Sequence, residues 1–309
     1  MKISQLKKTF TDGGMDKASY IEGMFAHHAG LFEYAALLKG SDIESIRILP
    51  GELRVRFAWP PIELAVPPDE MRAAPVEAIN FGTYEKEEFA VVEGLVAALD
   101  APAPVFVDIG GNVGFYSIGL KVLHPHLRIH AFEPVPGTAD QFEHNCVINN
   151  CSDISLHRCG LSDKPGRATF FVHPRMSVAA SQRNILEGEE MREVTCQLIP
   201  LDDLIPQLPE RIDFIKCDVE GAELFAFRGA ARLIERDRPI VFSEMLRKWS
   251  AKFDYHPNEI IAFFQQRGYQ CHALGKNGNR LLESVTDSTE ETNFIFLHQD
   301  AHEGLRLHR

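Results

Sequence analysis

From residue 105 onward, short apolar segments alternate with stretches that have a helical pattern. The segments are five to seven residues long and rich in Val, Ile and Phe: 105–110, 128–132, 154–159, 213–219, 239–245, 269–274 and 293–298. Segments of this kind are typical of parallel strands that are covered on both faces. The pattern therefore predicts a doubly wound, mostly parallel α/β sheet. A turn-rich loop joins the last two segments, so we expect an antiparallel pair there.

The intervening stretches predict helices at 114–124, 137–149, 221–236 and 257–267. Residues 161–211 depart from the alternation. Two further strands are expected in that region, at 168–173 and 193–199, around a polar loop with the sequence RMSVAASQRN.

The N-terminal region precedes this pattern. A helix is predicted over about 16–39, because apolar side chains recur there at helical spacing: Ile21, Met24, Phe25, His28, Phe32 and Ala35. A hairpin is expected in IRILPGELRVRF, with its turn at Pro50-Gly51, and the proline-rich WPPIELAVPPDE is expected to be extended or loop. We divide the chain into an accessory region, 1–80, and a cofactor-binding domain, 81–309.

Charge and composition exclude several classes of protein. The 309 residues carry a formal net charge of −12, which argues against a nucleic-acid partner because no excess of basic residues is available for phosphates. No apolar run approaches the ~20 residues that span a bilayer. The first residues, MKISQLKKTF, lack the apolar stretch of a secretory signal, and the six cysteines form no C-x-x-C pair. These features predict a cytoplasmic protein without a membrane span.

The most informative motif is VFVDIGGNVGFYSIGL at 105–120, where a strand ends, a glycine turn follows and a helix begins. In doubly wound folds this turn lets the backbone approach a ligand, and the helix start offers free N–H groups. The next strand ends in Glu133, 23 residues after Gly110. An acid at that place can accept hydrogen bonds from both hydroxyls of a ribose. The two features together predict a nucleoside cofactor.

NAD and S-adenosylmethionine both contain adenosine, so these motifs fit either cofactor. The G-x-G-x-x-G turn that a pyrophosphate requires is absent, and no tyrosine has Lys four positions later. Asp108, at the end of the first strand, suits a cofactor with an ammonium and a sulfonium group. An NAD(P)-dependent Rossmann oxidoreductase is the alternative from a different class.

At these residues the chain resembles the FkbM family of S-adenosylmethionine-dependent methyltransferases. The motifs that carry the resemblance are FGTYEKE, VDIGGNVGFYS, AFEPVPG, CGLSD, LDDL and IDFIKCDVEGAELFAFRGA, within about residues 80–245. The resemblance implies the class I methyltransferase fold, a Rossmann-like sheet of seven strands with an antiparallel last strand. Gly111 stands where the family often has Ala.

The resemblance also implies cofactor-binding roles. The methionine part would be surrounded by Asp108, Gly110, Asn112 and Gly114. Glu133 would hold the ribose, and the adenine would lie beside Gly160, Leu161 and Ser162. The methionine end would be closed by Tyr84 and Glu85. The expected cofactor-binding set is completed by Gly111, Phe115, Pro134 and Asp218.

The strand DFIKCDVEGAE predicts the chemical site. Alternation along a strand sends Lys216 and Asp218 to one face, with Glu220 continuing on that side. Glu244 ends the next strand at the same edge of the sheet. We expect these four side chains to meet the methyl acceptor, although an ion-pair network that closes the sheet edge is the alternative. His173, before the polar loop, is a further candidate base.

The resemblance thus implies a methyltransferase that uses S-adenosylmethionine to modify a hydroxyl of a small molecule: a sugar, a nucleotide-linked sugar or a natural product. An N-methyltransferase, which needs no strong base, and a methyltransferase-like binding protein are alternatives. The carboxylates would also suit Mg²⁺ or Mn²⁺, but we favour a metal-free site because no His accompanies them. We expect residues 1–80 to form part of the acceptor pocket or a homodimer contact.

Overall fold

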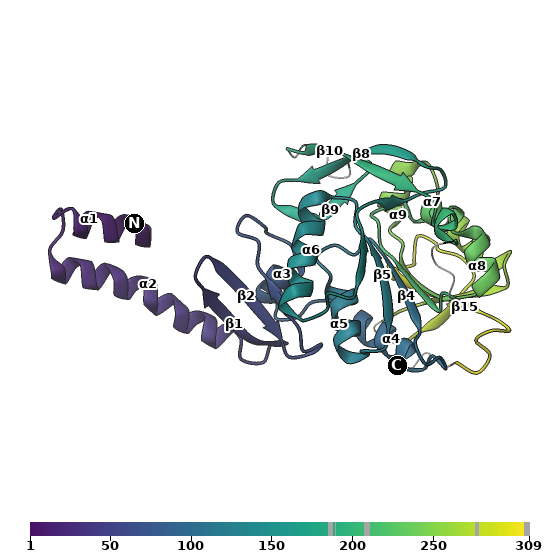
Figure 1. Ribbon diagram of the computed structural model, residues 1–309, viewed down its shortest axis with the longest axis horizontal. Helices are drawn as coiled ribbons and strands as arrows, with labels where there is room; N and C mark the ends of the chain where they lie inside the picture. The colour runs from purple at the N-terminus through teal and green to yellow at the C-terminus, as the bar shows by residue number, and fades with distance from the viewer. Residues whose placement is uncertain (185–187, 189, 207–210, 276–277, 306–309) are drawn as a thin grey trace.

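A central eight-stranded sheet organises the molecule (Figure 1). The computed structural model describes residues 1–184, 188, 190–206, 211–275 and 278–305, without the side chains of 177–179. The strand order is β14-β13-β15-β12-β11-β4-β5-β6. The bounds are β4 Val105–Ile109, β5 Arg128–Phe132, β6 Ser155–His157, β11 Phe214–Cys217, β12 Ile240–Glu244, β13 Tyr269–Ala273, β14 Arg280–Leu282 and β15 Asn293–His298.

The pairing confirms the predicted fold class. The ladders β6–β5, β5–β4, β4–β11 and β11–β12 are parallel, whereas β15 runs antiparallel to both of its neighbours, β12 and β13. Short β14 adds an antiparallel edge strand that the sequence pattern does not predict. The result is a mostly parallel α/β sheet with an antiparallel last strand.

Helices cover both faces of the sheet, as apolar strands require. Alternate strand residues point to opposite faces, so Val107 and Ile215 pack in a cluster with Leu224, whereas Phe106 packs in another cluster with Phe142. One face is covered by α7 (Glu223–Arg228), α8 (Ala231–Asp237) and α10 (Asn258–Gln265). The other is covered by α4 (Lys86–Ala97), α5 (Phe115–Leu123) and α6 (Pro136–Ile148).

The single helix predicted at 221–236 is wrong, because the structure has two helices there, α7 and α8. The Gly229 carbonyl accepts a hydrogen bond from the Asp202 N–H at 2.8 Å rather than continuing one helix. The Asp202 carboxylate then accepts from the N–H groups of Arg232 and Leu233, at 3.0 and 2.9 Å. Asp202 therefore caps α8 and separates it from α7.

A second sheet lies over one end of the first (top of Figure 1), in the order β7-β10-β8-β9. Its strands are β7 (Gly160–Leu161), β8 (Gly166–His173), β9 (Met176–Ser181) and β10 (Arg192–Ile199). The expected strands at 168–173 and 193–199 are confirmed as β8 and β10. The polar loop expected at RMSVAASQRN is wrong, because most of it forms β9, which pairs with the otherwise open edge of β8.

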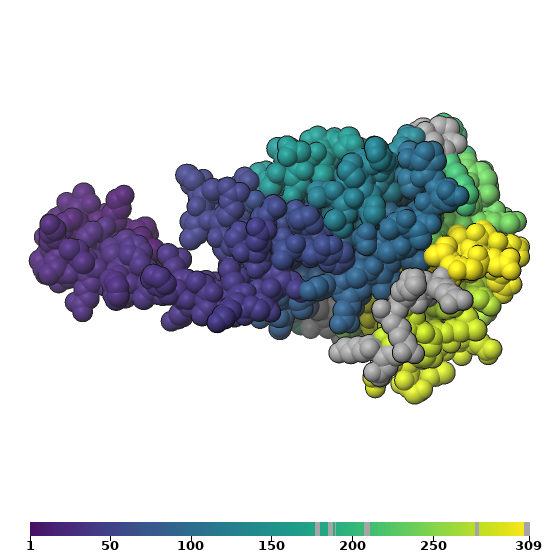
Figure 2. All heavy atoms as spheres, turned by 90° about the horizontal axis from the view of Figure 1, so that it is seen from below, coloured from purple at the N-terminus to yellow at the C-terminus, as the bar shows by residue number. Residues whose placement is uncertain are grey.

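The N-terminal region has two parts. Helices α1 (Ile3–Thr11) and α2 (Lys17–Leu37) form a pair that projects from the body, as Figures 1 and 2 both show. The predicted helix is confirmed, and the Asp16 carboxylate caps it by accepting from the Ser19 N–H at 3.0 Å. The predicted hairpin is confirmed as β1 (Ile43–Leu49) and β2 (Glu52–Phe57). A third strand, β3 (Glu63–Ala65), extends it.

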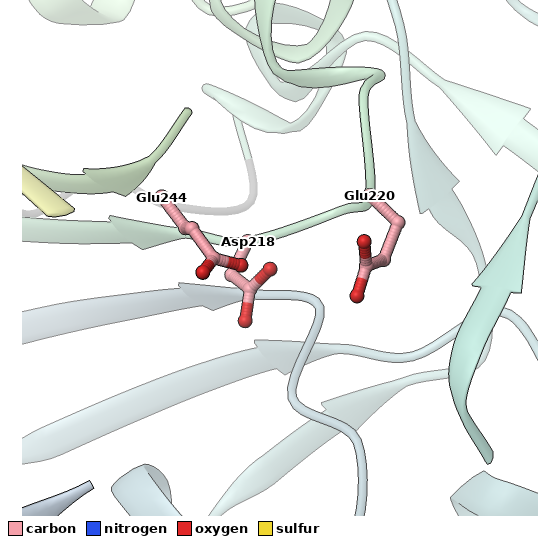
Figure 3. Close-up of side chains that lie close together, drawn as sticks. All are labelled: Asp218, Glu220 and Glu244. Carbon is pink, nitrogen blue, oxygen red and sulfur yellow. The ribbon is translucent and has the colours of Figure 1, made fainter. Parts of the chain in front are cut away.

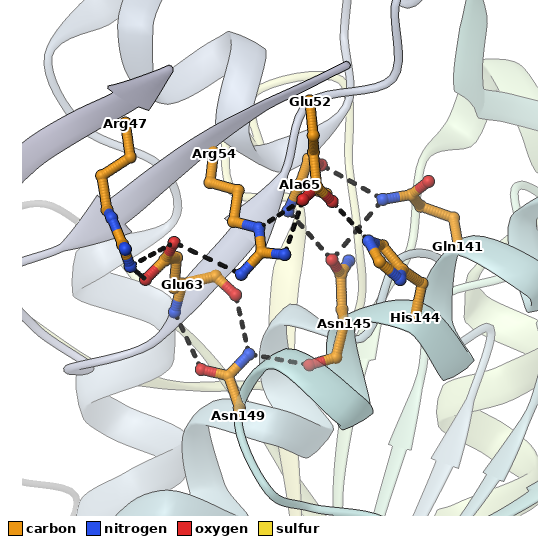
Figure 4. A network of polar contacts seen from close by, with 9 residues as sticks. All are labelled: Arg47, Glu52, Arg54, Glu63, Ala65, Gln141, His144, Asn145 and Asn149. Carbon is orange, nitrogen blue, oxygen red and sulfur yellow. Dashed lines mark hydrogen bonds and ion pairs between the residues drawn. The ribbon is translucent and has the colours of Figure 1, made fainter. Parts of the chain in front are cut away.

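The three-stranded N-terminal sheet docks on α6 through a polar network (Figure 4). Asn149 accepts from the Glu63 N–H at 2.8 Å and donates to the Glu63 carbonyl at 2.7 Å. Asn145 Oδ1 accepts from the Ala65 N–H at 3.0 Å, and its Nδ2 donates to the Val113 carbonyl at 2.9 Å. Two asparagine side chains thus satisfy the open edge of β3, and one of them also fixes the glycine turn after β4.

Replacing Asn145 with Leu is expected to lower the free energy of unfolding by about 2–4 kcal/mol. Asn145 is fully buried, so the variant would leave the Ala65 N–H and the Val113 carbonyl without partners. Urea unfolding measures this change. The exposed Asn184→Leu variant is the matched control and should change stability by no more than about 0.5 kcal/mol. Equal stability of the two variants would show that the Asn145 bridge is dispensable.

The hydrophobic core continues across residue 80. Val55 and Phe57 of the N-terminal sheet pack in the same cluster as Phe89, Phe115 and Phe142. All six cysteines are buried and unpaired. Among the residues that the structure describes, none of the helices combines the length and apolar character needed to cross a membrane.

Candidate active site

A cavity of about 500 Å³ opens at the carboxyl ends of the central strands. Ligands of doubly wound sheets bind at this edge. The lining comes from the turn after β4, the ends of β5, β11 and β12, the segment before α4, and α3 (Ala74–Phe81). Of the residues predicted for the site, the cavity is lined by Tyr84, Glu85, Gly110, Gly111, Asn112, Phe115, Glu133, Pro134, Lys216, Asp218, Glu220 and Glu244.

The glycine turn is packed too closely for side chains. Gly110 has φ +81°, and a Cβ atom on it would lie 1.9 Å from the carbonyl oxygen of Asp218. A Cβ on Gly114, at φ +91°, would lie 2.6 Å from the ring of Phe142. Asn112 between them also has a positive φ, 47°. The turn therefore holds its backbone against β11 and α6 and leaves the cavity side open.

Behind this turn lies a buried ion pair. Lys216 and Asp108 are 4% and 0% exposed, and Lys216 Nζ lies 3.4 Å from Asp108 Oδ1. The ammonium also donates to the Gly110 carbonyl at 2.9 Å and lies 3.8 Å from Asp218 Oδ2. Burial opposes the charge on Lys216, but the carboxylates of Asp108, Asp218 and Glu85 raise its pKa. Lys216 is therefore a fixed positive charge between the turn and the cavity.

Asp108 does not line the cavity. Its second carboxylate oxygen accepts a hydrogen bond from the Ser117 hydroxyl at 2.6 Å. The structure thus places Asp108 behind the turn, where it positions Lys216 and the start of α5.

Glu133 projects into the cavity from the end of β5. Its Oε1 accepts from the Val135 N–H at 2.9 Å and its Oε2 from the Asn112 N–H at 3.1 Å. Burial raises the pKa of Glu133 to about 7, although the two N–H groups act in the opposite direction. Each carboxylate oxygen keeps a further lone pair for a hydroxyl donor.

Three carboxyl groups, those of Asp218, Glu220 and Glu244, lie close together at the ends of two neighbouring strands (Figure 3). Asp218 and Glu220 follow β11, and Glu244 ends β12, so that oxygen atoms of all three lie within 4.8 Å of one another. This acidic cluster, Asp218, Glu220 and Glu244, has the donors and spacing for a divalent ion as well as for proton transfer. Glu220 has φ 52°, an uncommon backbone conformation that turns it toward the other two.

The two glutamates of the cluster have raised pKa values and bind protons more tightly than isolated carboxyl groups do. Burial, and then the charges of Asp218 and Glu223, raise the pKa of Glu220 to about 9. Burial, and then the charges of Asp218 and Glu220, raise the pKa of Glu244 to about 10. Glu85, across the cavity, has its pKa raised to about 6 by burial and by Asp218. A bound cation would lower these values.

Other predicted residues lie outside the cavity wall. Gly160, Leu161 and Ser162 do not line the cavity, but a Cβ on Gly160 would lie 3.6 Å from Pro134, which does. His173 lines a separate cavity of about 490 Å³, so the structure does not bring it together with the acidic cluster.

The cavity residues that escaped the sequence reasoning include Arg72 and Glu77 at α3, and Lys248 and Trp249 in α9 (Arg247–Ser250). Arg72 Nε donates to Glu77 Oε1 at 2.7 Å, and Lys248 Nζ lies 4.2 Å from the centre of the Trp249 ring. A charged residue just before α3 and the single Trp after β12 are weak signals. Only the tertiary fold brings these residues to the cavity.

A family model, the Methyltransferase FkbM domain, matches residues 108–271, which is just over half of the chain and includes the glycine turn, Glu133 and the acidic cluster. The chain belongs to this family. It is 31% identical over 150 residues to Methyltransferase 1 of Beauveria bassiana, covering 42% of this chain and 60% of that protein. It spans about 60% of the length of that relative.

Two further relatives have more specific names. The 2-O-methyltransferase NoeI of Sinorhizobium fredii is 27% identical over 160 residues, covering 47% of this chain and 64% of that protein. The 31-O-demethyl-FK506 methyltransferase FkbM of Streptomyces tacrolimicus is 27% identical over 144 residues, covering 43% and 53%. A solved FkbM methyltransferase from Methylobacillus flagellatus is 20% identical, with a TM-score of 0.41, covering 72% of this chain and 53% of that one.

Proposed function

We propose that this protein transfers the methyl group of S-adenosylmethionine to a hydroxyl group of a small molecule, namely a sugar or a natural product. The observation that carries the proposal is the arrangement of one cavity. Its first wall is a glycine turn with Glu133, and its second wall is the acidic cluster with Lys216.

The residues of the first wall fit an adenosyl cofactor. The glycines let the turn pack its backbone against β11 and α6 while Gly110, Gly111 and Asn112 line the cavity, and Glu133 offers a carboxylate for the two ribose hydroxyls. Asn112 Oδ1 is a buried acceptor without a hydrogen-bond partner among the described residues, which suits a donor on a ligand. Glu85 and Asp218 supply negative charge for an ammonium or sulfonium group.

The residues of the second wall fit an acceptor hydroxyl. When bound, S-adenosylmethionine supplies an activated methyl group on a sulfonium, which is a good leaving group. The protein must therefore hold the acceptor in line and remove its proton. We assign proton removal to the acidic cluster and the base to Glu220, whose Oε2 is buried without a hydrogen-bond partner in the described part of the chain. The positive charge of the bound cofactor would lower the raised pKa of Glu220, so that its carboxylate is free to accept the proton.

The acceptor-facing part of the cavity is polar and aromatic. Trp249 offers a flat face of the kind that packs against a sugar ring, and Arg72 and Lys248 add positive charge suited to a nucleotide-linked sugar. Arg72 and Glu77 belong to the accessory region, so we propose that its segment 72–77 forms part of the acceptor pocket.

Two measurements distinguish this proposal from an oxidoreductase and from an N-methyltransferase. Calorimetry with S-adenosylmethionine and with NADH tests the cofactor, and tight NADH binding would overturn the proposal in favour of an oxidoreductase. A panel of glycosides, nucleotide sugars and amines with methyl-labelled cofactor then tests the acceptor. Label on a hydroxyl oxygen supports the proposal, whereas label only on amines would identify an N-methyltransferase.

Replacing Glu133 with Ala is expected to weaken the binding of S-adenosylhomocysteine by about 1.5–3 kcal/mol, because charge-assisted hydrogen bonds to the ribose are lost. This ligand has no sulfonium charge, so its affinity reports the ribose contact rather than the acidic cluster. Since the pKa of Glu133 is about 7, wild-type affinity should rise between pH 6 and pH 8, as the carboxyl group loses its proton. The variant should lose that rise.

The control for this prediction is Glu143→Ala, an exposed Glu on α6 that lies outside the cavity. It should bind as the wild type does. Unchanged affinity in a folded Glu133→Ala protein would remove Glu133 from the cofactor site.

A further inference from the structure

Helix α2 has no buried residue, although most of its side chains are apolar. Three large side chains on one side, Ile21, Phe25 and Phe32, are 56%, 68% and 77% exposed. A helix that is apolar on nearly all sides is normally buried. The helix pair projects from the body in Figures 1 and 2, so the body of the same chain does not cover it.

Helix α1 covers a different side of α2. Leu6 of α1 is buried, and a Cβ atom on Gly23 of α2 would lie 2.8 Å from its side chain. The rings of Phe10 and Tyr20 stack with their centroids 4.4 Å apart. With about 100° of rotation per residue, Ile21, Phe25 and Phe32 lie roughly half a turn away from Gly23. They form, with Ala36, an apolar stripe that α1 leaves open.

The stripe has the same spacing in both directions along the helix. Its four members, Ile21, Phe25, Phe32 and Ala36, are separated by four, seven and four residues. Two copies of α2 can therefore pack antiparallel about a two-fold axis, with Phe25 of each opposite Phe32 of the other and the axis between His28 and Ala29. A self-complementary surface of this kind is what an isologous dimer requires.

We propose that the apolar stripe of α2 docks against the same stripe of a second copy of this chain. The three large side chains of the stripe, Ile21, Phe25 and Phe32, leave about 400 Å² per chain accessible, or ~800 Å² for two copies. This area is below the ~1,200–2,000 Å² of standard stable interfaces and in the range of weak ones, so we expect a dimer that forms at micromolar concentrations.

The charge pattern disfavours an anionic membrane as the occupant. Between Ala18 and Leu38 the chain has no Lys or Arg, and its charged residues there are Glu22 and Glu33. Helices that lie on anionic lipid carry basic residues on their polar face. A homodimer contact is one of the two roles expected for residues 1–80. The proposed antiparallel packing assigns this contact to the apolar stripe of α2.

The first test is the oligomeric state of the full chain by sedimentation velocity. We expect the wild type to be a dimer at about 10 μM and Phe25→Glu/Phe32→Glu to be a monomer. The dissociation constant of the dimer should rise by at least ~100-fold in this double variant. The control Val147→Glu changes an equally exposed apolar residue on α6 and should remain dimeric. Circular dichroism should show the same helix content in all three proteins.

The second test uses the register. All six native cysteines are buried, so an added Cys on α2 is the accessible thiol. Ala29→Cys, next to the axis, should form an intermolecular disulfide on mild oxidation. Ala18→Cys should not, because its two copies would lie about 30 Å apart in an antiparallel pair.

Several outcomes would overturn the proposal. A wild-type monomer at about 100 μM would exclude the dimer, and a dimer that survives Phe25→Glu/Phe32→Glu would place the interface elsewhere. Equal cross-linking of Ala18→Cys and Ala29→Cys would exclude the antiparallel packing of the two apolar stripes. A monomer that sediments with phosphatidylcholine–phosphatidylglycerol vesicles, and loses this in the double variant, would assign the stripe to lipid instead.

Discussion

Replacing Glu220 with Gln is expected to lower methyl transfer by about 10²–10⁴-fold, with little change in cofactor affinity. Gln keeps the shape of the side chain but cannot accept the proton of an acceptor hydroxyl. Turnover is measured with labelled S-adenosylmethionine and the acceptor found in the panel. The exposed Glu259→Gln on α10 is the matched control and should turn over at the wild-type rate.

The same experiment separates a base from a metal ligand. If the acidic cluster works as a base, EDTA should leave wild-type turnover unchanged. Loss of turnover in EDTA that Mg²⁺ or Mn²⁺ restores would assign the three carboxylates to a metal ion. Full activity of Glu220→Gln and of Asp218→Asn, with or without EDTA, would show that the cluster is an ion-pair network of the sheet edge.

The Glu220→Gln variant should also be more stable than the wild type at pH 8. The pKa of Glu220 rises from the ordinary 4.5 to about 9 on folding, so the folded chain holds a proton that the unfolded chain has lost. Stability therefore falls as pH rises above about 4.5, and Gln removes this cost. Thermal unfolding should give a higher Tm for the variant at pH 8 and no difference at pH 4.

The parts of the fold that repeat along the sequence could be predicted. The bounds predicted for β5 and β15 are those of the structure, because apolar runs between turns define buried strands. The glycine turn and Glu133 could also be placed, since both follow strands at the same edge of the sheet. Lys216, Asp218 and Glu244 come together for the same reason.

The parts of the fold and of the site that depend on contacts between distant residues could not be predicted from the sequence. The break between α7 and α8 is caused by Asp202, which is 30 residues from Arg232 in sequence. Arg72 precedes the recognised motifs in the sequence and Trp249 follows them, yet both residues line the cavity. The apolar pattern of α2 predicted a helix correctly, but a pattern shows which side is apolar and not what covers it.

Replacing Lys216 with Met is expected to lower the free energy of unfolding by about 3–5 kcal/mol. Lys216 is the cation beside the fully buried Asp108, and Met would leave that carboxylate with its hydrogen bond from the Ser117 hydroxyl but without this cation. Urea unfolding measures the loss, and the exposed Lys164→Met should change stability by no more than about 0.5 kcal/mol.

Adding Asp108→Asn to Lys216→Met tests the cause of this loss. Asn is neutral and can still bond to Ser117, so the double variant should be more stable than Lys216→Met by about 1–3 kcal/mol. It should still bind S-adenosylmethionine poorly, because the Gly110 carbonyl loses the ammonium that holds the turn. If the second substitution recovers no stability, the buried charge of Asp108 is not what Lys216 compensates. The ammonium would then act chiefly on Asp218 and the cavity.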